Sequence, residues 1–458
     1  NYTIKNGGNI ILKGYLEAKE NISFEMIIWL TEETPNDYQG QTETGTPRNV
    51  IYNGNFKIYT RQILDIDNNL DTSKANMPEL ASNMIPVYYD ETEEVWKKAD
   101  KYNSKEEYRW YSYESSGEYK GMWANAVTVT ETNRTTYLNA TAGTAIPMDD
   151  INTMWVWIPR FNAVTPSNYN GGAKESPGAI DVTFVNVNET AIDAFTFGNK
   201  ELSGFWYAKF ETSHSTLASS TTSNNLGCTN ETCSNANGII IKPNVTSLKY
   251  NNISNFFYAS RSMEQTGNSF GFVSSEVDTH MSKNNEWGAV AYLTQSIYGR
   301  CTNSTTCTEV GINNNKSYIT GYGAPAGSSS SVTNGTYNTT LGKDASTTGT
   351  IYGIYDMSGG AWEYVMGVYN KTIANSGFSS LPDSKYYNNY TGTSYTGHAL
   401  TETKNWYSDY ADFVFTSYPW FLRGGNYGDG ASAGVFGFGI NDGNSYNSYS
   451  SRPVISNE

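Results

Sequence analysis

Hydrophobic and polar positions alternate only over short stretches of this chain, which predicts many brief strands and few helices. Near the start, Ile22, Phe24 and Ile27–Leu30 form an apolar stretch of strand length. Two further apolar runs flank Asn53-Gly54, a dipeptide that tolerates the positive φ angles of a tight hairpin turn. We therefore expect residues 1–63 to form a small N-terminal β module, either sandwich-like or able to donate a strand to a neighbouring molecule.

The next segment, residues 64–151, is polar and charged, which predicts irregular structure. It also contains Trp96, Trp110 and Trp123, and tryptophan side chains are highly buried on average. We expect this segment to be a connector that packs on the main domain.

From residue 152 to residue 458, short aromatic strands alternate with long loops rich in Gly, Ser and Asn. One helix is predicted at Glu286–Gln295, where Trp287, Val290 and Leu293 are spaced for a buried face. Residues 321–349 have low complexity and are expected to form a surface insertion. The predicted fold class is α+β, mostly β and loop, with the N-terminal β module preceding one larger domain.

Composition narrows the function. The chain has 458 residues, with 30 Lys+Arg against 45 Asp+Glu and a net charge of −15. Nucleic acid and anionic membranes are therefore excluded as main partners, because both require a basic face. Only 16% of residues are charged while 14% are aromatic, a balance typical of proteins that bind through phenols and amides. No apolar run is long enough for a membrane span, and the start at Asn1 without a signal peptide leads us to expect a processed, extracellular chain.

The four cysteines form two close pairs, Cys228/Cys233 and Cys301/Cys307. Three connectivities are available to four cysteines, and pairing within each short loop is the simplest. A zinc site favours tighter Cys spacing or nearby histidines. The histidines of the chain are scattered, at His214, His280 and His398. We expect two disulfides that pin loops, and an oxidising compartment.

Several spaced motifs lie in a fixed order along the main domain. Together they resemble the formylglycine-generating-enzyme-like, or sulfatase-modifying-factor, branch of the C-type-lectin-like fold, over about residues 152–458. The sequence departs from that family at Gly360, where Asn is usual, and at Tyr364, where Trp is usual. The motifs are FWYAKFE at 205–211, NEWGAVAY at 285–292, YDMSGGAWEYV at 355–365, LRGGN at 422–426 and SRPV at 451–454.

The resemblance implies a structural calcium site in the turn that follows Tyr355. The ligands would be the side chains of Asp356 and Glu363 with the carbonyls of Gly359 and Ala361. The residues allow this, since two carboxylates on either side of a Gly-rich turn can surround a hard cation. The alternative is that Asp356 caps a turn while Glu363 pairs with Arg423 inside the fold. We expect Arg423 and Arg452 to be structural, bonded to buried carbonyls or to Glu363.

The same resemblance bears on catalysis. The oxidases of the family use cysteines near the Arg-Gly-Gly segment, and no cysteine follows Cys307 in this chain. A non-haem iron site would need a cluster of histidines, and the three here are far apart in sequence. The sequence therefore predicts a protein that is not an enzyme and has no redox cofactor.

The C-terminal stretch 425–452 has a composition of its own: it lacks Lys, Glu, Gln, Met and Trp. It resembles the variable region of diversity-generating retroelement proteins, in which adenine-directed mutagenesis yields Asn, Tyr, Asp, Ser, Ile, Phe and Gly but none of those five residues. Rigid phenols with adaptable amides and hydroxyls are also typical of a paratope. The alternative is a Gly/Asn-rich terminal loop. Candidate ligand-binding residues are Asn426, Tyr427, Asp429, Phe436, Phe438, Ile440, Asn441, Asp442, Asn444, Tyr446, Asn447 and Tyr449.

Three functional hypotheses follow. The first is a non-catalytic ligand-binding or adhesion protein, displayed on a bacterial surface or phage virion, whose partner is a protein or glycan on another cell or surface. The second is a structural subunit of a bacterial extracellular filament or pilus, which self-assembles through the N-terminal strand at 1–16. The third is a formylglycine-generating-type oxidase.

Overall fold

The computed structural model describes residues 69–218, 224–229 and 232–457 in full, and the backbone of three strands nearer the N-terminus. The chain divides into two compact units, residues 1–69 and 70–458. In the first unit, β1 (Tyr2–Asn6) pairs antiparallel with β2 (Asn9–Gly14) and with β3 (Tyr59–Thr60). The apolar strand expected at 22–30 and the hairpin expected at Asn53-Gly54 lie outside the described residues.

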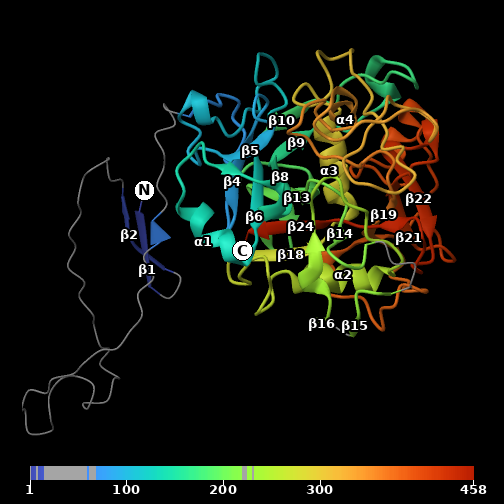
Figure 1. The fold of residues 1–458 in the computed structure, drawn as a ribbon. Helices are drawn as coiled ribbons and strands as arrows, with labels where there is room; N and C mark the ends of the chain where they lie inside the picture. The colour runs from blue at the N-terminus through green and yellow to red at the C-terminus, as the bar shows by residue number, and fades with distance from the viewer. Residues whose placement is uncertain are drawn as a thin grey trace, which may run out of the picture. The chain divides into compact units, whose positions relative to one another are not determined.

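The second unit is built on an eight-stranded antiparallel sheet in the order β18-β24-β13-β8-β6-β4-β5-β7. The C-terminal strand β24 lies inside this sheet, between β13 and β18, as the red arrow between a green and a yellow neighbour shows (Figure 1). This position places the end of the chain, and Arg452 just before it, in the middle of the fold. The strands are β4 (Ile85–Asp90), β5 (Val95–Lys98), β6 (Asn125–Val129), β7 (Ala145–Ile146), β8 (Ile151–Pro159), β13 (Gly204–Ala208), β18 (Val277–Met281) and β24 (Pro453–Asn457).

The segment 64–151 differs from the irregular structure that the sequence predicts, because four of these strands, β4 to β7, lie within it. The hairpin β4–β5 alternates apolar positions, but the exposed turn that joins the two strands is acidic and hides that pattern in an average over the segment. Trp96, Trp110 and Trp123 are each at most 1% exposed. The tryptophans therefore belong to the main hydrophobic core.

A second, five-stranded sheet carries the C-terminal motifs. Its order is β20-β19-β21-β22, and β23 pairs with the start of β19. The neighbours β19, β21 and β22 are antiparallel, whereas β20 and β23 both run parallel to β19. The strands are β19 (Trp362–Tyr369), β20 (Asn388–Tyr390), β21 (Trp420–Gly424), β22 (Gly434–Asn441) and β23 (Tyr449–Ser450).

Helices are few. Alpha helices are α1 (Glu131–Asn139), α2 (Ile253–Ser262), α3 (Asn284–Thr294) and α4 (Thr340–Asp344). The helix predicted at 286–295 is confirmed as α3, but it is buried on every side and not on one face alone. None of the helices in the described ranges is long and apolar enough to cross a bilayer.

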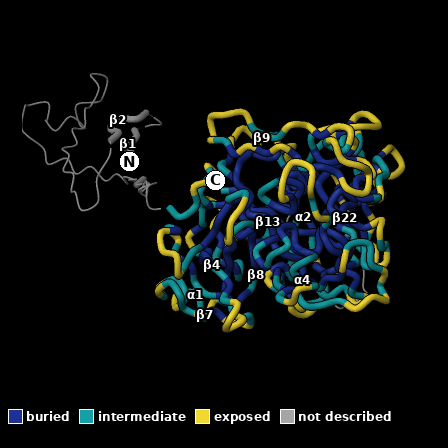
Figure 2. The backbone as a smooth tube through the Cα atoms, turned by 90° about the horizontal axis from the view of Figure 1, so that it is seen from above, coloured by how far each residue is buried: buried dark blue, intermediate teal, exposed yellow. Residues whose placement is uncertain are grey.

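Four small two-stranded sheets complete the second unit. They pair β9 (Phe161–Ala163) with β10 (Val182–Phe184), β11 (Thr196–Phe197) with β12 (Lys200–Glu201), β14 (Ser213–His214) with β17 (Ile239–Ile240), and β15 (Cys228–Thr229) with β16 (Thr232–Cys233). Exposed segments gather in the loops at the rim, while the sheets and helices α2 and α3 are largely buried (Figure 2).

Both predicted disulfides are present, Cys228–Cys233 and Cys301–Cys307. Each closes a short loop between residues that face one another across a β-bridge. The low-complexity stretch 321–349 is only partly the surface insertion that its composition predicts. It contains α4, and Ala324, Tyr337 and Ala345 within it are buried.

Candidate functional site

The predicted ligand-binding residues fall into three groups by exposure. Asn444, Tyr446 and Asn447 are exposed at the surface, and Tyr446 is 52% exposed. A second group is half-buried and consists of Asn426, Tyr427, Asp429, Ile440, Asp442 and Tyr449. The third group, Phe436, Phe438 and Asn441, is buried. Nine of the twelve are thus at least partly exposed: seven lie in two turns, one before β22 and one after it, while Ile440 lies in β22 and Tyr449 in β23.

Phe436 and Phe438 are corrections to the predicted site. The ring of Phe436 packs on Trp406, with centroids 5.1 Å apart, and that of Phe438 packs on Phe421 at 6.1 Å. Both lie in β22, whose residues Gly434–Gly439 are all buried. Side chains that are 2% and 1% exposed have no surface to offer a ligand. Their amino-acid types fit the diversified set, but their place in a central strand gives them to the core.

The turn after β22 is held on its buried side by Tyr364. This is the position at which the resembled family usually has Trp. The hydroxyl of this buried tyrosine lies 2.5 Å from Asn441 Oδ1 and 2.7 Å from the carbonyl of Asn444. Its ring meets that of Tyr449 edge-on, and Tyr449 in turn packs on Tyr446, with centroids 5.1 Å apart. The exposed phenol of Tyr446 is therefore the outer member of a supported aromatic group.

The turn before β22 is held by β19 as well. The backbone N–H of Tyr427 donates to the carbonyl of Gly360, and that of Trp362 donates to the carbonyl of Ser448 in the other turn, both at 2.9 Å. Hydrogen bonds to the start of β19 and to the residue two positions before it therefore hold both turns in place. The Tyr427 ring packs edge-on against Tyr318, with centroids 4.9 Å apart.

Sequence reasoning missed a group of aromatic residues upstream of the C-terminal stretch. Tyr410, Phe415 and Tyr418 are 46%, 43% and 46% exposed. The Phe438 N–H donates to the carbonyl of Tyr410 and the Asp412 N–H donates to the carbonyl of Phe438, so this loop runs along β22. The Tyr410 ring also meets Trp362, at a centroid distance of 6.2 Å. Three large exposed aromatics within nine residues, in the DYADFVFTSY stretch, are the signal that could have found them.

The contacts of Asp356 and Glu363 favour the alternative to calcium binding, in which Asp356 caps a turn and Glu363 pairs with an arginine. Asp356 Oδ1 accepts hydrogen bonds from Asn313 Nδ2 and from the Gly321 N–H, both at 2.8 Å. Both oxygens of Glu363 accept from the guanidinium of Arg452. In the described part of the chain, no group of three or more His, Cys, Asp or Glu side chains is placed to hold a metal ion. Calcium binding stays a prediction. These ligands do not fit a calcium ion, because the guanidinium of Arg452 already pairs with the carboxylate of Glu363.

The partner expected for Glu363 was wrong: Arg452, not Arg423, pairs with it. Arg423 instead contacts Asn284 Oδ1 at 3.0 Å and the carbonyls of His398 and Ala399. Arg452 also donates to the carbonyls of Ala208 and Tyr355. Burial opposes the charge on Arg452, but Glu363 outweighs burial and raises the pKa of the guanidinium. Both arginines are structural, as the sequence predicts.

The other departure from the family, Gly360, is explained by Glu211. The carboxylate of Glu211 accepts from the Ala361 N–H at 2.7 Å and from the hydroxyl of Ser247. A Cβ at position 360 would collide with Glu211, and the φ of +68° disfavours any side chain there. Burial, reinforced by the neighbouring Asp356, raises the pKa of Glu211.

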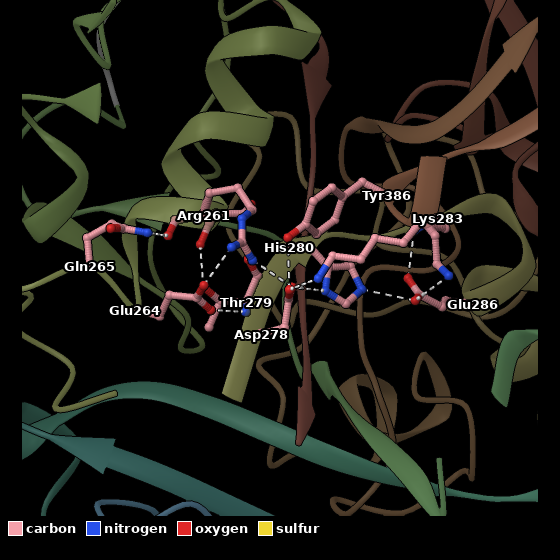
Figure 3. Close-up of polar contacts among 11 residues, drawn as sticks. Arg261, Glu264, Gln265, Asp278, Thr279, His280, Lys283, Glu286 and Tyr386 are labelled. Carbon is pink, nitrogen blue, oxygen red and sulfur yellow. Dashed lines mark hydrogen bonds and ion pairs between the residues drawn. The ribbon is translucent and has the colours of Figure 1, made fainter. Parts of the chain in front are cut away.

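A second polar group lies away from the C-terminal turns, around His280 (Figure 3). The imidazole lies between two buried carboxylates, with Nδ1 3.1 Å from Asp278 and Nε2 3.0 Å from Glu286. Burial opposes protonation, but the two carboxylates outweigh it and raise the pKa of His280. Arg261 pairs with Asp278 at 2.6 Å, and Lys283 lies 3.4 Å from Glu286.

The three histidines do not come together. The ring of His214 is held by the carbonyl of Asn235, and that of His398 by Asp193 and the hydroxyl of Tyr390, each at 2.7 Å. His398 is 2% exposed, so its ring belongs to the interior of the fold.

Comparisons with known proteins give distant likenesses. No family model matches the chain, and no curated protein matches it. Among solved structures, the Major Tropism Determinant P3c variant has a TM-score of 0.27 at 13% identity, covering 84% of this chain and 74% of that one. The M1 variant has a TM-score of 0.25 at 13% identity, covering 85% of each chain. The U1 variant has a TM-score of 0.23 at 14% identity, covering 84% of this chain and 98% of that one. At such TM-scores, the likeness carries no argument about this chain.

Proposed function

We propose that this protein is a non-catalytic binding protein, displayed outside the cell or on a virion, that recognises its ligand through the turns on either side of β22. The observation that carries the proposal is how the C-terminal stretch divides between fixed and free positions. Small residues occupy the positions where the backbone leaves no room. Asn, Tyr, Asp and Ser occupy many of the exposed and half-exposed positions.

The fixed positions are sterically defined. A Cβ on Gly434 would enter the carboxylate of Asp409, and one on Gly443 would lie 2.7 Å from Ser376 Cα. A Cβ on Gly425 would come within 2.6 Å of the Ala433 methyl group. Directly after Gly443, Asn444, Tyr446 and Asn447 project from a turn that Tyr364 holds in place. Such a surface can vary in sequence while its scaffold stays the same, which is the property of a paratope.

The lectin-like, formylglycine-generating-enzyme-like ancestry belongs to the same proposal. Its support is the ordered motifs, whose residues form one connected buried group. Lys209 donates to the carbonyls of Ile351 and Gly353, and Glu211 and Glu363 lie beside Asp356. In this arrangement the motif residues support the turns and are themselves buried.

The test is binding to the surface of candidate partner cells or to purified surface extract. Replacing Tyr427, Tyr446 and Tyr449 with Ala is expected to abolish binding, because such phenols supply most of the contact area in a paratope. The matched control replaces Tyr169, Tyr387 and Tyr369, half-buried tyrosines outside the stretch. Binding that persists in the first variant would falsify the proposal.

Deep sequencing of codons 420–455 in the source population is expected to show variation at positions such as 444, 446 and 447, with Gly434 and Gly443 constant.

The filament hypothesis keeps one supporting observation. Strand β2 forms one edge of the three-stranded sheet of the first unit, and β3 covers only two residues of β1 at the other side. An edge of this kind can accept a strand from another molecule. Deleting residues 1–14 and measuring assembly by electron microscopy separates the two functions: loss of fibres supports a filament, and unchanged binding by monomers supports the first proposal.

A further inference from the structure

A cleft of about 620 Å³ lies apart from the C-terminal turns, and none of its lining residues belongs to 425–452. Five segments build it: the hairpin β11–β12 with the turn before it, β18, the start of α3, the loop leading into β20, and the end of β24. A volume of this size is in the range that holds small ligands in proteins. The polar group around His280 forms part of its wall, through Asp278 and Lys283 (Figure 3).

The charges of the cleft are balanced. Three lysines and three aspartates line it. The lysines already have acceptors: Lys385 lies 3.0 Å from Asp278, Lys200 donates to the carbonyl of Asn457 at 2.7 Å, and Lys283 lies near Glu286. Because three carboxylates accompany the three lysines, the cleft has no excess of positive charge, which argues against an anion such as phosphate. The charged residues are Lys200, Lys283, Lys385, Asp193, Asp278 and Asp383.

The wall also holds polar atoms that the chain does not satisfy. Asn285 Oδ1, Ser456 Oγ and Asn457 Oδ1 find no hydrogen-bond partner in the ranges that the structure describes. Asn285 is 3% and Ser456 1% exposed, so that water is largely kept from them. Unsatisfied buried groups cost free energy, and three in the wall of one cleft indicate that a ligand supplies their partners after small side-chain rotations.

The aromatic part of the wall completes the ligand's description. The ring of Phe197 is stacked on His280, with centroids 4.6 Å apart, and Lys283 and Lys385 lie about equally far from it, at 5.0 and 4.9 Å. Phe197 and Tyr387 both line the cleft. Phe197 is 7% exposed, so the ring that a ligand can reach is the half-buried Tyr387, together with many hydrogen-bond donors and acceptors and no net charge.

We infer that this cleft binds a neutral saccharide of one or two rings. Sugar hydroxyls both donate and accept hydrogen bonds, so they can serve the lysine and amide N–H groups together with the oxygens of Asn285 and Ser456. The C–H face of a pyranose can pack on the ring of Tyr387 in the wall of the cleft. The site is distinct from the proposed recognition surface, and the inference stands whether or not that surface binds a partner.

The experiment uses the full chain and saturation-transfer NMR with glucose, galactose, mannose, N-acetylglucosamine and lactose. Asn199→Trp adds a large side chain at an exposed position in the lining and is expected to block the cleft. Asn188→Trp makes the same change at an exposed position outside the lining. We expect at least one sugar to bind, with affinity about tenfold or more weaker in Asn199→Trp and unchanged in Asn188→Trp and in Tyr446→Ala.

Ser456→Ala gives an independent check. Because this hydroxyl makes no hydrogen bond among the described residues, its removal is expected to leave the melting temperature unchanged or higher, while sugar affinity falls. The inference is overturned if none of the five sugars binds, if sugar binding is the same in Asn199→Trp as in the parent protein, or if inorganic phosphate occupies the cleft more tightly than any sugar.

Discussion

Arg452 and Glu363 form an ion pair in the core, with Nε of the arginine 2.6 Å from Oε2 of the glutamate. They are 89 residues apart in the sequence, and Arg452 is the last residue of the C-terminal stretch. Glu363 is in β19, whose start holds both turns of the proposed recognition surface, and Arg452 immediately precedes β24, the second strand of the large sheet. The pair therefore links the two sheets at the point from which the turns project.

Removing one partner of this pair is expected to be costly. Glu363→Gln leaves the Arg452 charge buried without its counter-ion, and the free energy of unfolding should fall by about 3–5 kcal/mol. The double variant Glu363→Met with Arg452→Met should lose less than Glu363→Gln alone, because no charge is then left buried. Chemical denaturation monitored by tryptophan fluorescence measures both. As a control, Glu91→Gln removes the exposed partner of Lys343 and should cost under about 1 kcal/mol. Equal, small losses in all three would show that the pair contributes little.

The hydroxyl of Tyr364 makes the second prediction. Tyr364→Phe leaves Asn441 Oδ1 and the Asn444 carbonyl without this donor, and should cost about 1–2 kcal/mol. Hydrogen exchange should also become faster at residues 442–449, because the hydroxyl ties this turn to β19. Tyr446→Phe, at a phenol that is 52% exposed, is the matched control and should change neither quantity. Unaltered exchange in Tyr364→Phe would mean that backbone contacts alone hold the turn.

Features with short-range signals could be predicted from the sequence. The two disulfides join cysteines five and six residues apart, and the spacing of the apolar residues in α3 predicts a helix. The structural role of both arginines also followed from their rarity in a chain with so few cations.

Long-range relationships could not be predicted in the same way. Glu363 and Arg423 are indeed neighbours across β19 and β21, but the guanidinium of Arg423 turns to the carbonyls of 398 and 399, and Arg452 arrives from another sheet. Nothing local in the sequence encodes that choice. Likewise, composition placed Phe436 and Phe438 among the ligand-binding residues because it records residue types and not strand positions. The cleft beside His280 depends on five segments that meet only in the fold.

Gly434 provides a prediction about the scaffold of the variable-like stretch. Gly434→Ala would push a methyl group into the carboxylate of Asp409, which also accepts from the Phe436 N–H at 3.0 Å. We expect a loss of about 2–3 kcal/mol, as for overpacking in a core. Gly428→Ala, in the same stretch, meets nothing closer than Asn426 Oδ1 at 3.3 Å and should be nearly neutral. Melting temperatures of the two variants test this prediction. Similar melting temperatures for Gly434→Ala and Gly428→Ala would show that β22 can shift to accommodate the methyl group.

Glu309 makes the last prediction, which concerns pH. It lines a small cavity beside β22 together with Asp409, and burial, opposed by Arg300, raises the pKa of Glu309 from 4.5 to about 7. The folded protein therefore holds this proton more tightly than the unfolded chain does. The stability gained is fully present below about pH 4.5 and is lost as the pH rises to about 7.

Glu309→Gln stays uncharged across this range, so it should flatten the fall in stability between those two pH values. At pH 7 the variant should be more stable than the parent by about 1 kcal/mol, a value reduced for the partial exposure of the side chain. Unfolding measured at several pH values tests this, with the exposed Glu118→Gln as the control that should keep the parent's profile. If Glu309→Gln follows the parent curve throughout, the carboxyl titrates alike in the folded and unfolded states. The acidic group beside β22 would then be Asp409 alone, whose pKa burial also raises, with the nearby Glu309 adding to the effect.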